Sequence, residues 1–504
     1  MSAAQSELLR GLVVPDGRTD EDDAAFPSRP AIPPVLAFAL GVWAGCVASL
    51  AFARSLSIVL CVVACAVGAV ACLCCTCLIW RCRRCLLALV LVAGLFCGAT
   101  LGFVQGVRLH LAQQVASESQ GLLHVVVLSD GSEGEFGVSC MARVQAEGSA
   151  RSFAAKVSFP SGHAVPFYGQ RFSGYGSISE LSDDRASWGW QRGIAANVKL
   201  RTCEQVPLQG PGAALLSFRE RAVRALTEPL RGDRGLAAAI SCGWRADLPE
   251  DVYRQFQVSG LAHVVAVSGA HLSIVAALVA SLLGALRFPK PVSIAAQIAL
   301  LVAYLALTAM PASAIRAALM TVAGMTSWTA RRRASSLSAL GCCITVMLAL
   351  DAQAALSSSF ALSVLATLGI VLFGGIMNSW LRYSLGWVPA FIREALALTF
   401  ASSVIATPFS AALFSQLPLA APFANIVTAP LFGPVCAAGI VGAVACALLP
   451  APNLASSLAC GCACLLLKAV QACSSIPYAS IPIVAPVSVA LFAGFTVACG
   501  LWLW

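Results

Sequence analysis

The sequence predicts a polytopic α-helical membrane protein of about 12 spans, within a range of about 10 to 14, with one small β domain outside the membrane. Three observations predict this class. Hydrophobic residues make up 59% of the 504 residues and charged residues 11%, whereas an ordinary soluble domain is about 25% charged. Apolar runs of about 17 to 25 residues, long enough to cross a bilayer, recur through most of the chain. One stretch instead alternates apolar and polar side chains, which is the period of a β-strand.

The chain starts with a polar tail, residues 1–30, that includes the acidic run DGRTDEDD. A three-span membrane segment, residues 31–108, follows, with apolar runs over Ala31–Ala53, Ser55–Trp80 and Cys85–Val107. A signal peptide is not predicted, because the first apolar run leads into two more runs and not into a cleavage site. We therefore expect a cytoplasmic N-terminus.

Residues 109–206 form the predicted β domain. The segments LLHVVVLSDGSEGEFGVSC and RSFAAKVSFPSG alternate between turn signals of Gly, Ser and Asp, as half-buried strands do. This domain holds two of the 22 cysteines, Cys140 and Cys203, which could form a disulfide outside the cytoplasm. Most other cysteines lie in apolar runs, where cysteine packs as a small hydrophobe, so we expect no metal site and no cofactor.

An Arg-rich amphipathic connector, residues 207–257, predicts helices that return the chain to the membrane. Residues 258–504 then hold about nine further apolar runs. Basic residues fall in alternate connections, at RCRR (81–84), RFPK (287–290), RRR (331–333) and Arg382, with two exceptions, Arg54 in an outer connection and a neutral inner connection near Pro450. Short cytoplasmic loops hold an excess of Lys and Arg, so we expect these connections and both termini in the cytoplasm, and the β domain outside.

The stretch GLAHVVAVSGAHLSIVAALV, residues 260–279, places His263 and His271 around the pair Ser268 and Gly269 in an apolar segment. Ionisable residues inside a membrane are costly and usually face a cavity or a partner. On one continuous helix the histidines would lie about 80° apart and about 12 Å along the axis, on one interior face. The Ser-Gly pair could instead break the helix beside a water-filled cavity. The simpler interpretation is that each histidine is a hydrogen-bonded packing residue.

Two further apolar segments carry isolated polar residues. Arg316 lies in YLALTAMPASAIRAALM, where it either extends to the membrane surface or lines an aqueous path and pairs with an anion. Asn425 lies in TPFSAALFSQLPLAAPFANIVTAPLFGP, which contains five prolines. Proline-rich apolar sequence predicts broken helices next to a cavity, since unpaired backbone groups cannot face lipid.

Four blocks follow one another over residues 230–431. They read LRGDRGLAAAISCGWRADLPEDVYRQFQVSGLAHVVAVSGAHLSIV, YLALTAMPASAIRAALM, LDAQAALSSSFALSVLATLGI and SQLPLAAPFANIVTAPL. In order and spacing they resemble the ComEC competence family. Upstream, WGWQRGI (188–194) resembles the end of the OB-like β domain that members often carry after three spans. The resemblance implies an inner-membrane channel of bacteria that passes single-stranded DNA into the cytoplasm during natural transformation.

The resemblance also implies a site and partners. The residues expected to line the channel are His263, Ser268, Gly269, His271, Arg316 and Asn425. The expected partners are single-stranded DNA, membrane lipid, an extracytoplasmic DNA receptor, a cytoplasmic ATP-driven helicase-like motor and a second copy of the chain. The motor is expected to be a separate protein, because the sequence has no GxxxxGK[ST] phosphate-binding loop.

The sequence departs from the family pattern in one respect. Many members end in a metallo-hydrolase domain of the β-lactamase type, which needs clustered His and Asp ligands. This sequence has no histidine after His271 and ends in the apolar GFTVACGLWLW. We therefore expect a transport protein without that domain and without enzymatic activity of its own.

The β domain supplies candidates for DNA contact, which are Trp188, Trp190, Arg192, Lys199 and Arg201. Acidic residues slightly outnumber basic ones in this domain, so its electrostatic attraction for a phosphate backbone is weak. Aromatic stacking, about 1 to 3 kcal/mol per base, could compensate. Most of the aromatic side chains are nevertheless expected in the core of the domain.

Other functional classes fit some of these features. A secondary transporter of another solute or a membrane-embedded transferase would also use broken helices and intramembrane polar groups. A rhomboid-like protease would activate Ser268 with a histidine. The protease hypothesis does not fit, because Ala266 stands where the GxSG motif of that family needs glycine and no later span supplies a histidine.

Overall fold

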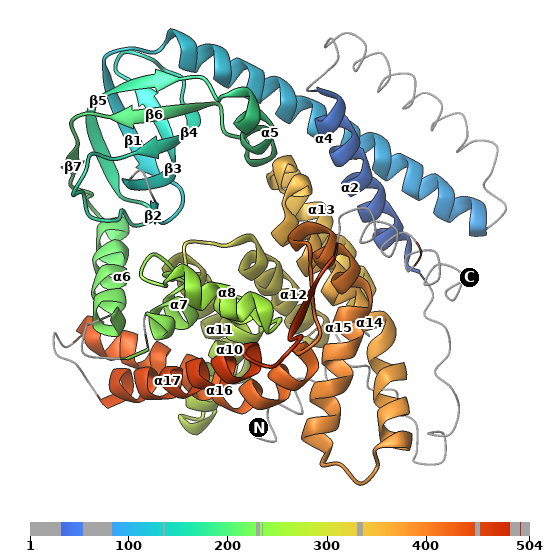
Figure 1. The fold of residues 1–504 in the computed structure, drawn as a ribbon. Coiled ribbons are helices and arrows are strands. Elements are labelled where there is room, and N and C mark those ends of the chain that lie inside the picture. The colour runs from blue at the N-terminus through green and yellow to red at the C-terminus, as the bar shows by residue number, and fades with distance from the viewer. Residues whose placement is uncertain are drawn as a thin grey trace.

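The computed structural model describes residues 32–53, 83–134, 137–227, 232–233, 235–329, 336–448, 454–483 and 494. Within them a small β barrel lies at one end and helices form the rest of the molecule (Figure 1). The predicted class, a mainly helical chain with one small β domain, is confirmed in this form. The polar tail, the apolar run Ser55–Trp80 and most of the C-terminal end lie outside the described residues.

The N-terminal helices are α2 (Pro34–Ala53) and α4 (Arg83–Glu118), and they pack backbone against backbone through glycines. A Cβ atom on Gly41 would lie 2.1 Å from the Leu91 carbonyl oxygen, and one on Gly98 would lie 1.9 Å from that of Val42. Only glycine fits at such positions, as in the small-residue interfaces of membrane helices. Helix α4 extends beyond this contact and leads into the barrel (Figure 1).

The β domain is a closed barrel. Its strands are β1 (Leu122–Val127), β2 (Ser132–Gly134), β3 (Gly137–Ala146), β4 (Phe153–Ser158), β5 (Arg171–Ser179), β6 (Ala196–Leu200) and β7 (Glu204–Val206). The hydrogen-bonded order β1-β3-β4-β6-β5 closes through a pairing of β5 with β1, and β4 and β6 are parallel. Alternate residues such as Phe153, Ala155 and Val157 are buried in the barrel, which is the period that the sequence predicted.

Helix α5 (Asp183–Arg192) connects the barrel to the N-terminal helices through Trp190. The Trp190 indole Nε1 donates a hydrogen bond of 2.9 Å to the Leu50 carbonyl in the last turn of α2. The Gln353 side-chain amide donates to the Trp190 carbonyl, and the His110 ring of α4 lies 5.1 Å from the Trp190 ring. We call this contact the Trp190 joint. It connects the barrel to α2 and α4 and to the segment after residue 350.

Cys140 and Cys203 are both free thiols, so the disulfide raised from the sequence is not present. Cys140 lies on the buried face of β3, whereas Cys203 follows β6 and is half-buried. Burial raises the pKa of the Cys140 thiol to about 12 and that of Cys203 to about 11. Both thiols therefore stay protonated at neutral pH.

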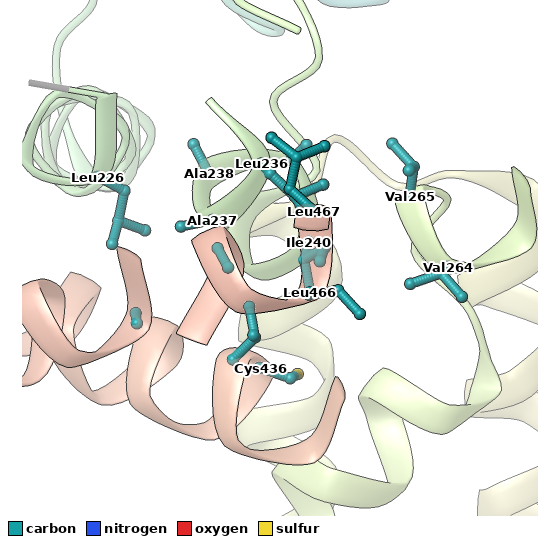
Figure 2. Packing of buried hydrophobic residues seen from close by; sticks show 14 of the residues in the cluster. Leu226, Leu236, Ala237, Ala238, Ile240, Val264, Val265, Cys436, Leu466 and Leu467 are labelled. Atoms are coloured by element: carbon teal, nitrogen blue, oxygen red, sulfur yellow. The ribbon is translucent and has the colours of Figure 1, made fainter. Parts of the chain in front are cut away.

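Three helices after the barrel build the largest apolar core with two helices near the end of the chain. These are α6 (Pro211–Thr227), α7 (Leu236–Cys242) and α8 (Glu250–Val258), with α16 (Ala421–Leu448) and α17 (Leu454–Ser474). Every residue of α7 is buried. Figure 2 shows Leu236 and Ile240 of α7 packed against Leu466 and Cys436, residues more than 190 positions further along.

The remaining elements lie between α8 and α16, apart from one short strand near the end. They are α9 (Ala262–Val265), α10 (Gly269–Ala285), α11 (Lys290–Leu307), α12 (Ala312–Thr329), α13 (Ser336–Leu350), the 3-10 turn η2 (Ala352–Leu356), α14 (Ser358–Ser384), α15 (Ala390–Phe414), β8 (Gln416–Pro418) and its partner β9 (Ser480–Pro482). Helices α14 and α15 form a long hairpin (Figure 1).

Six helices among the described residues, α2, α4, α14, α15, α16 and α17, are long and apolar enough to cross a membrane. Helices α10 to α13 are apolar but shorter. The prediction of about 12 spans is therefore not confirmed. Local breaks explain part of the difference, because α10 starts only after the interruption at Ser268 and α12 starts only after Pro311.

Candidate functional site

The apolar segment around the two histidines is broken. Helix α9 ends at Val265 and α10 begins at Gly269. Ala266 and Ser268 between them have extended backbone, with ψ angles of 133° and 177°. The predicted interruption at Ser268 and Gly269 is confirmed, and a continuous helix with the histidines on one face is wrong.

His271 holds the start of the second half of this broken helix. The backbone N–H of Ser268 donates to Nδ1 of His271 at 2.9 Å, and the Ser268 hydroxyl lies 3.1 Å from the same nitrogen. The two residues form a capping box, in which Glu or Gln is the usual partner. His271 is 0% exposed. The histidine thus has a backbone partner that explains its place in an apolar helix.

The cap fixes which ring nitrogen carries the proton. A backbone N–H can only donate, so Nδ1 must present its lone pair and the proton of the neutral ring must be on Nε2. Nε2 is buried and bonds to no described residue. The ring stands edge-on to Phe432 of α16, with centroids 4.8 Å apart and planes at 88°. His271 therefore keeps a buried donor without a partner among the described residues, in a ring that packs against α16.

Helix α16 brings polar groups to this side. Pro430 and Pro434 lie inside the helix, and each removes one backbone hydrogen bond, which frees the carbonyls of Ile426 and Pro430. Asn425 is half-buried and precedes Phe432 by two helical turns, so on a regular helix both lie on one face. Asn425 and Phe432, the residue that packs against the His271 ring, both belong to α16, which contacts α10.

Arg316 is oriented differently. One guanidinium nitrogen donates to the Thr367 hydroxyl of α14 at 2.6 Å and lies 3.7 Å from the Met320 sulfur. Nε of Arg316 is buried without a partner among the described residues. Arg316 thus bonds toward α14 while His271 faces α16, and the structure does not bring the two into one bonded group.

Helix α12 nevertheless contacts the break through a neighbour of Arg316. The Ser313 hydroxyl donates to the Val267 carbonyl in the unwound segment at 2.6 Å. Gly269 faces α12 as well, because a Cβ atom there would lie 3.4 Å from that of Ala317. His263, on α9, is exposed. The broken helix thus contacts α12 through Val267 and Gly269, and it contacts α16 through His271.

The barrel carries a second polar group, around Trp188. The half-buried Trp188 ring has the Arg192 guanidinium 4.6 Å from its centroid and the Lys156 ammonium 5.7 Å away. Lys199 is exposed on β6, in register with Ser158 of the strand that carries Lys156. This cation–aromatic cluster consists of Trp188, Arg192, Lys156 and Lys199.

Two of the predicted contact residues of the barrel are not in this cluster. Arg201 is exposed in the turn after β6. Trp190 is 6% exposed and bonds to Leu50, so the prediction that it stacks on DNA is corrected: it is a structural residue of the Trp190 joint. Lys156 was not among the residues predicted from the sequence, although its outward position in the alternation of β4 was a signal.

No group of three or more His, Cys, Asp or Glu side chains within the described ranges is arranged to hold a metal ion. A surface cavity lies between α4 and the end of α13 and is lined by Gln105, Arg108 and Leu348 among others; its lining includes no residue of the broken helix or of the cation–aromatic cluster.

Comparison with known proteins gives one match. A family model described as Competence, competence protein, matches residues 240–504. No curated protein and no solved structure matches the chain. The matched region begins in α7 and contains the broken helix, Arg316 and Asn425.

Proposed function

The chain belongs to the competence protein family, whose model covers just over half of it, and we propose on this basis that it passes single-stranded DNA across the inner membrane during natural transformation. The observation that carries the proposal is the broken helix α9–α10 with the unpaired Nε2–H of His271 beside α16. Discontinuous membrane helices and buried polar groups mark substrate paths in transport proteins. The start of α10 also carries the partial positive charge of a helix N-terminus, which favours an anion such as a phosphate.

The proposed lining of the path is His263, Ser268, Gly269, His271, Arg316 and Asn425. His271, Asn425 and the break would contact the strand at the α10–α16 side. Arg316 would act from the α14 side, because its hydrogen bond is to Thr367. A polyanion needs water or a donor at each phosphate inside hydrocarbon, and these side chains supply donors.

The proposed orientation places the barrel outside and both termini in the cytoplasm. Its support is the excess of Lys and Arg in alternate connections. The barrel is proposed to be OB-like and to receive single-stranded DNA. Five strands closed into one ring and an aromatic side chain flanked by cations support this assignment, since OB folds bind single strands by stacking and charge.

Transport in this proposal depends on other proteins. An extracytoplasmic receptor would deliver the strand, and an ATP-driven helicase-like motor would pull it from the cytoplasmic side. A second copy of the chain is a further proposed partner. The chain itself is proposed to be a conduit and not an enzyme.

The experiment uses a naturally competent bacterium from which its own family member has been deleted. Expression of this chain should restore transformation by labelled DNA, and the label should enter the cytoplasm. A secondary transporter of another solute or a transferase would leave the deletion strain unable to take up DNA, even with the chain present in the membrane at normal level. That result would refute the proposal.

A further inference from the structure

One buried arginine of α6 joins the barrel to α11. Arg219 of α6 is 1% exposed. Two of its guanidinium nitrogens donate to the two carboxylate oxygens of Asp130, at 2.6 and 2.5 Å, and Nε donates to the Leu307 carbonyl at 2.5 Å. Asp130 lies between β1 and β2, and Leu307 is the last residue of α11. A single planar side chain therefore connects three segments of the protein.

The barrel side of this junction is held by further contacts. The backbone N–H of Tyr168 donates to Asp130 at 2.9 Å. The Gln170 amide donates to the Glu220 carboxylate of α6 at 2.7 Å. The Phe167 ring stacks on Trp244, after α7, with centroids 4.2 Å apart. The loop before β5 thus has fixed contacts with α6 and with the α7–α8 connection.

On its other side, the junction contains the strained turn between α11 and α12. After Leu307 the chain passes through Ala309 and Met310, which have φ angles of 61° and 49°. Two consecutive non-glycine residues in the left-handed region persist only where the surroundings hold them. The Tyr168 hydroxyl, 4.0 Å from the Met310 sulfur, brings the barrel to the same turn. The turn is therefore held from the barrel and from Arg219 at once.

The turn leads directly to the broken helix. Helix α12 begins at Ala312, and its first turn contains Ser313, which donates to the Val267 carbonyl between α9 and α10. A continuous series of bonded contacts thus runs from Asp130 through Arg219, the α11–α12 turn and Ser313 to the unwound segment.

We propose that Arg219 is a positioning residue that couples the barrel to the unwound segment between α9 and α10, so that displacement of the barrel changes the conformation at that segment. The consequence for DNA passage rests on the proposed function, but the coupling itself does not. The bidentate fork and the third bond of Nε require an arginine, because a lysine ammonium cannot reproduce this planar arrangement. A buried ion pair is weak evidence for net stability. The coupling depends instead on the fixed positions that the three bonds of Arg219 impose on Asp130 and Leu307.

The test compares amide hydrogen exchange in the full-length protein, purified in detergent, for Arg219→Lys and the wild type. Arg219→Lys keeps the charge but loses the fork. We expect exchange to rise by about tenfold at residues 308–313 and at residues 266–269, while β3 and β4 keep their protection. Arg221→Lys is the matched control: Arg221 is exposed on the same helix and bonds to the Ser217 carbonyl of that helix, so it should change neither segment.

The opposite result is a change confined to residues 128–131 and 165–170, or no change at all, and either would overturn the coupling. If Arg219→Lys does not accumulate, hydrogen exchange is measured on Asp130→Asn, and the same changes at residues 308–313 and 266–269 are expected. Asparagine keeps the size of the side chain and one acceptor oxygen but loses the second acceptor for Arg219. Exchange is measured without DNA, so a failure of the proposed function leaves this result intact. Uptake by Asp130→Asn cells at normal protein level then reports separately whether the coupling matters for transport.

Discussion

His271 combines two roles in one ring. Nδ1 caps the start of α10, and Nε2 is left as a buried donor without a partner among the described residues, in a ring that packs against Phe432 of α16. The Ser268 hydroxyl also lies close to Nδ1, but His271 cannot act as its general base. The one lone pair of Nδ1 already accepts the backbone N–H of Ser268. The buried histidine in this apolar segment is therefore explained by helix geometry before any function is assigned.

Substitution of His271 separates packing from function. Glutamine can accept from the Ser268 N–H through its oxygen and still donate through its nitrogen, so His271→Gln should keep both membrane level and DNA uptake. His271→Ala removes cap and donor, and we expect a near-normal level with uptake lower by at least about tenfold, which about 1.4 kcal/mol on the barrier would give. Transformation frequency normalised to protein level is the measurement. Equal uptake by the alanine variant would mean that the ring only packs.

Arg316 is tested in the same way. Arg316→Ala should leave the membrane level near normal and lower uptake by at least about tenfold, and Arg316→Lys should retain part of the activity, because the charge survives without the fork. Thr367→Val is the matched control, since it removes the hydroxyl that accepts the bond from Arg316. If Thr367→Val alone reproduced the full loss, the arginine would act by joining α12 to α14 and not by lining a path.

Among the elements, α2 and α4 form the tightest helix pair, and glycine makes their approach possible. A methyl group at Gly98 would overlap the Val42 carbonyl, and overpacking of this kind costs about 1 to 3 kcal/mol or more. Gly98→Ala should therefore lower the thermal stability and the membrane level of the protein. Gly375→Ala in α14, where a Cβ meets nothing within 4 Å, should be neutral. A fully stable Gly98→Ala variant would show that the two helices are not packed this closely.

Helix α5 carries two tryptophans only two positions apart that we expect to behave differently. Trp188→Ala in the full chain should weaken binding of single-stranded DNA several-fold, because stacking on one base is worth about 1 to 3 kcal/mol, and it should leave the melting temperature nearly unchanged. Trp190→Ala should instead lower stability, because it removes the bond to Leu50. Fluorescence titration and thermal melting measure the two effects. Normal DNA affinity of the Trp188 variant would exclude the cation–aromatic cluster as a binding surface.

The sequence predicts these elements better than it predicts individual contacts. Alternation in FAAKVS and the break at Ser268 are local patterns, and the structure contains both. The burial of Trp190, the bond of Arg316 to Thr367 and the Arg219 junction are not local, because their partners lie 51 to 140 residues away. No periodicity in one segment encodes a partner in another, so Arg219 stood out only as one basic residue of an amphipathic helix.

For the whole molecule, the orientation in the membrane is a prediction that follows from the basic connections. A cysteine introduced at Gly148, in the turn between β3 and β4, should react with an impermeant maleimide in intact cells. A cysteine at position 332, within the predicted cytoplasmic RRR connection, should react only after the membrane is permeabilised. The chain without an introduced cysteine is the control, because it gives the background labelling of the 22 native cysteines. The reverse pattern would invert the topology.

The two hydrogen bonds of the Trp190 joint can form only in a fixed order during synthesis of the chain. Leu50 has left the ribosome long before Trp190, but Gln353 follows Trp190 by 163 residues. At a synthesis rate of about 5 to 20 residues per second, this gap lasts about 8 to 33 s. The bond from Trp190 to Leu50 can thus form during synthesis, whereas the bond from Gln353 must wait. During synthesis the barrel is therefore attached to α2 first, and a ribosome that stalls between residues 190 and 353 leaves the barrel without its bond from Gln353.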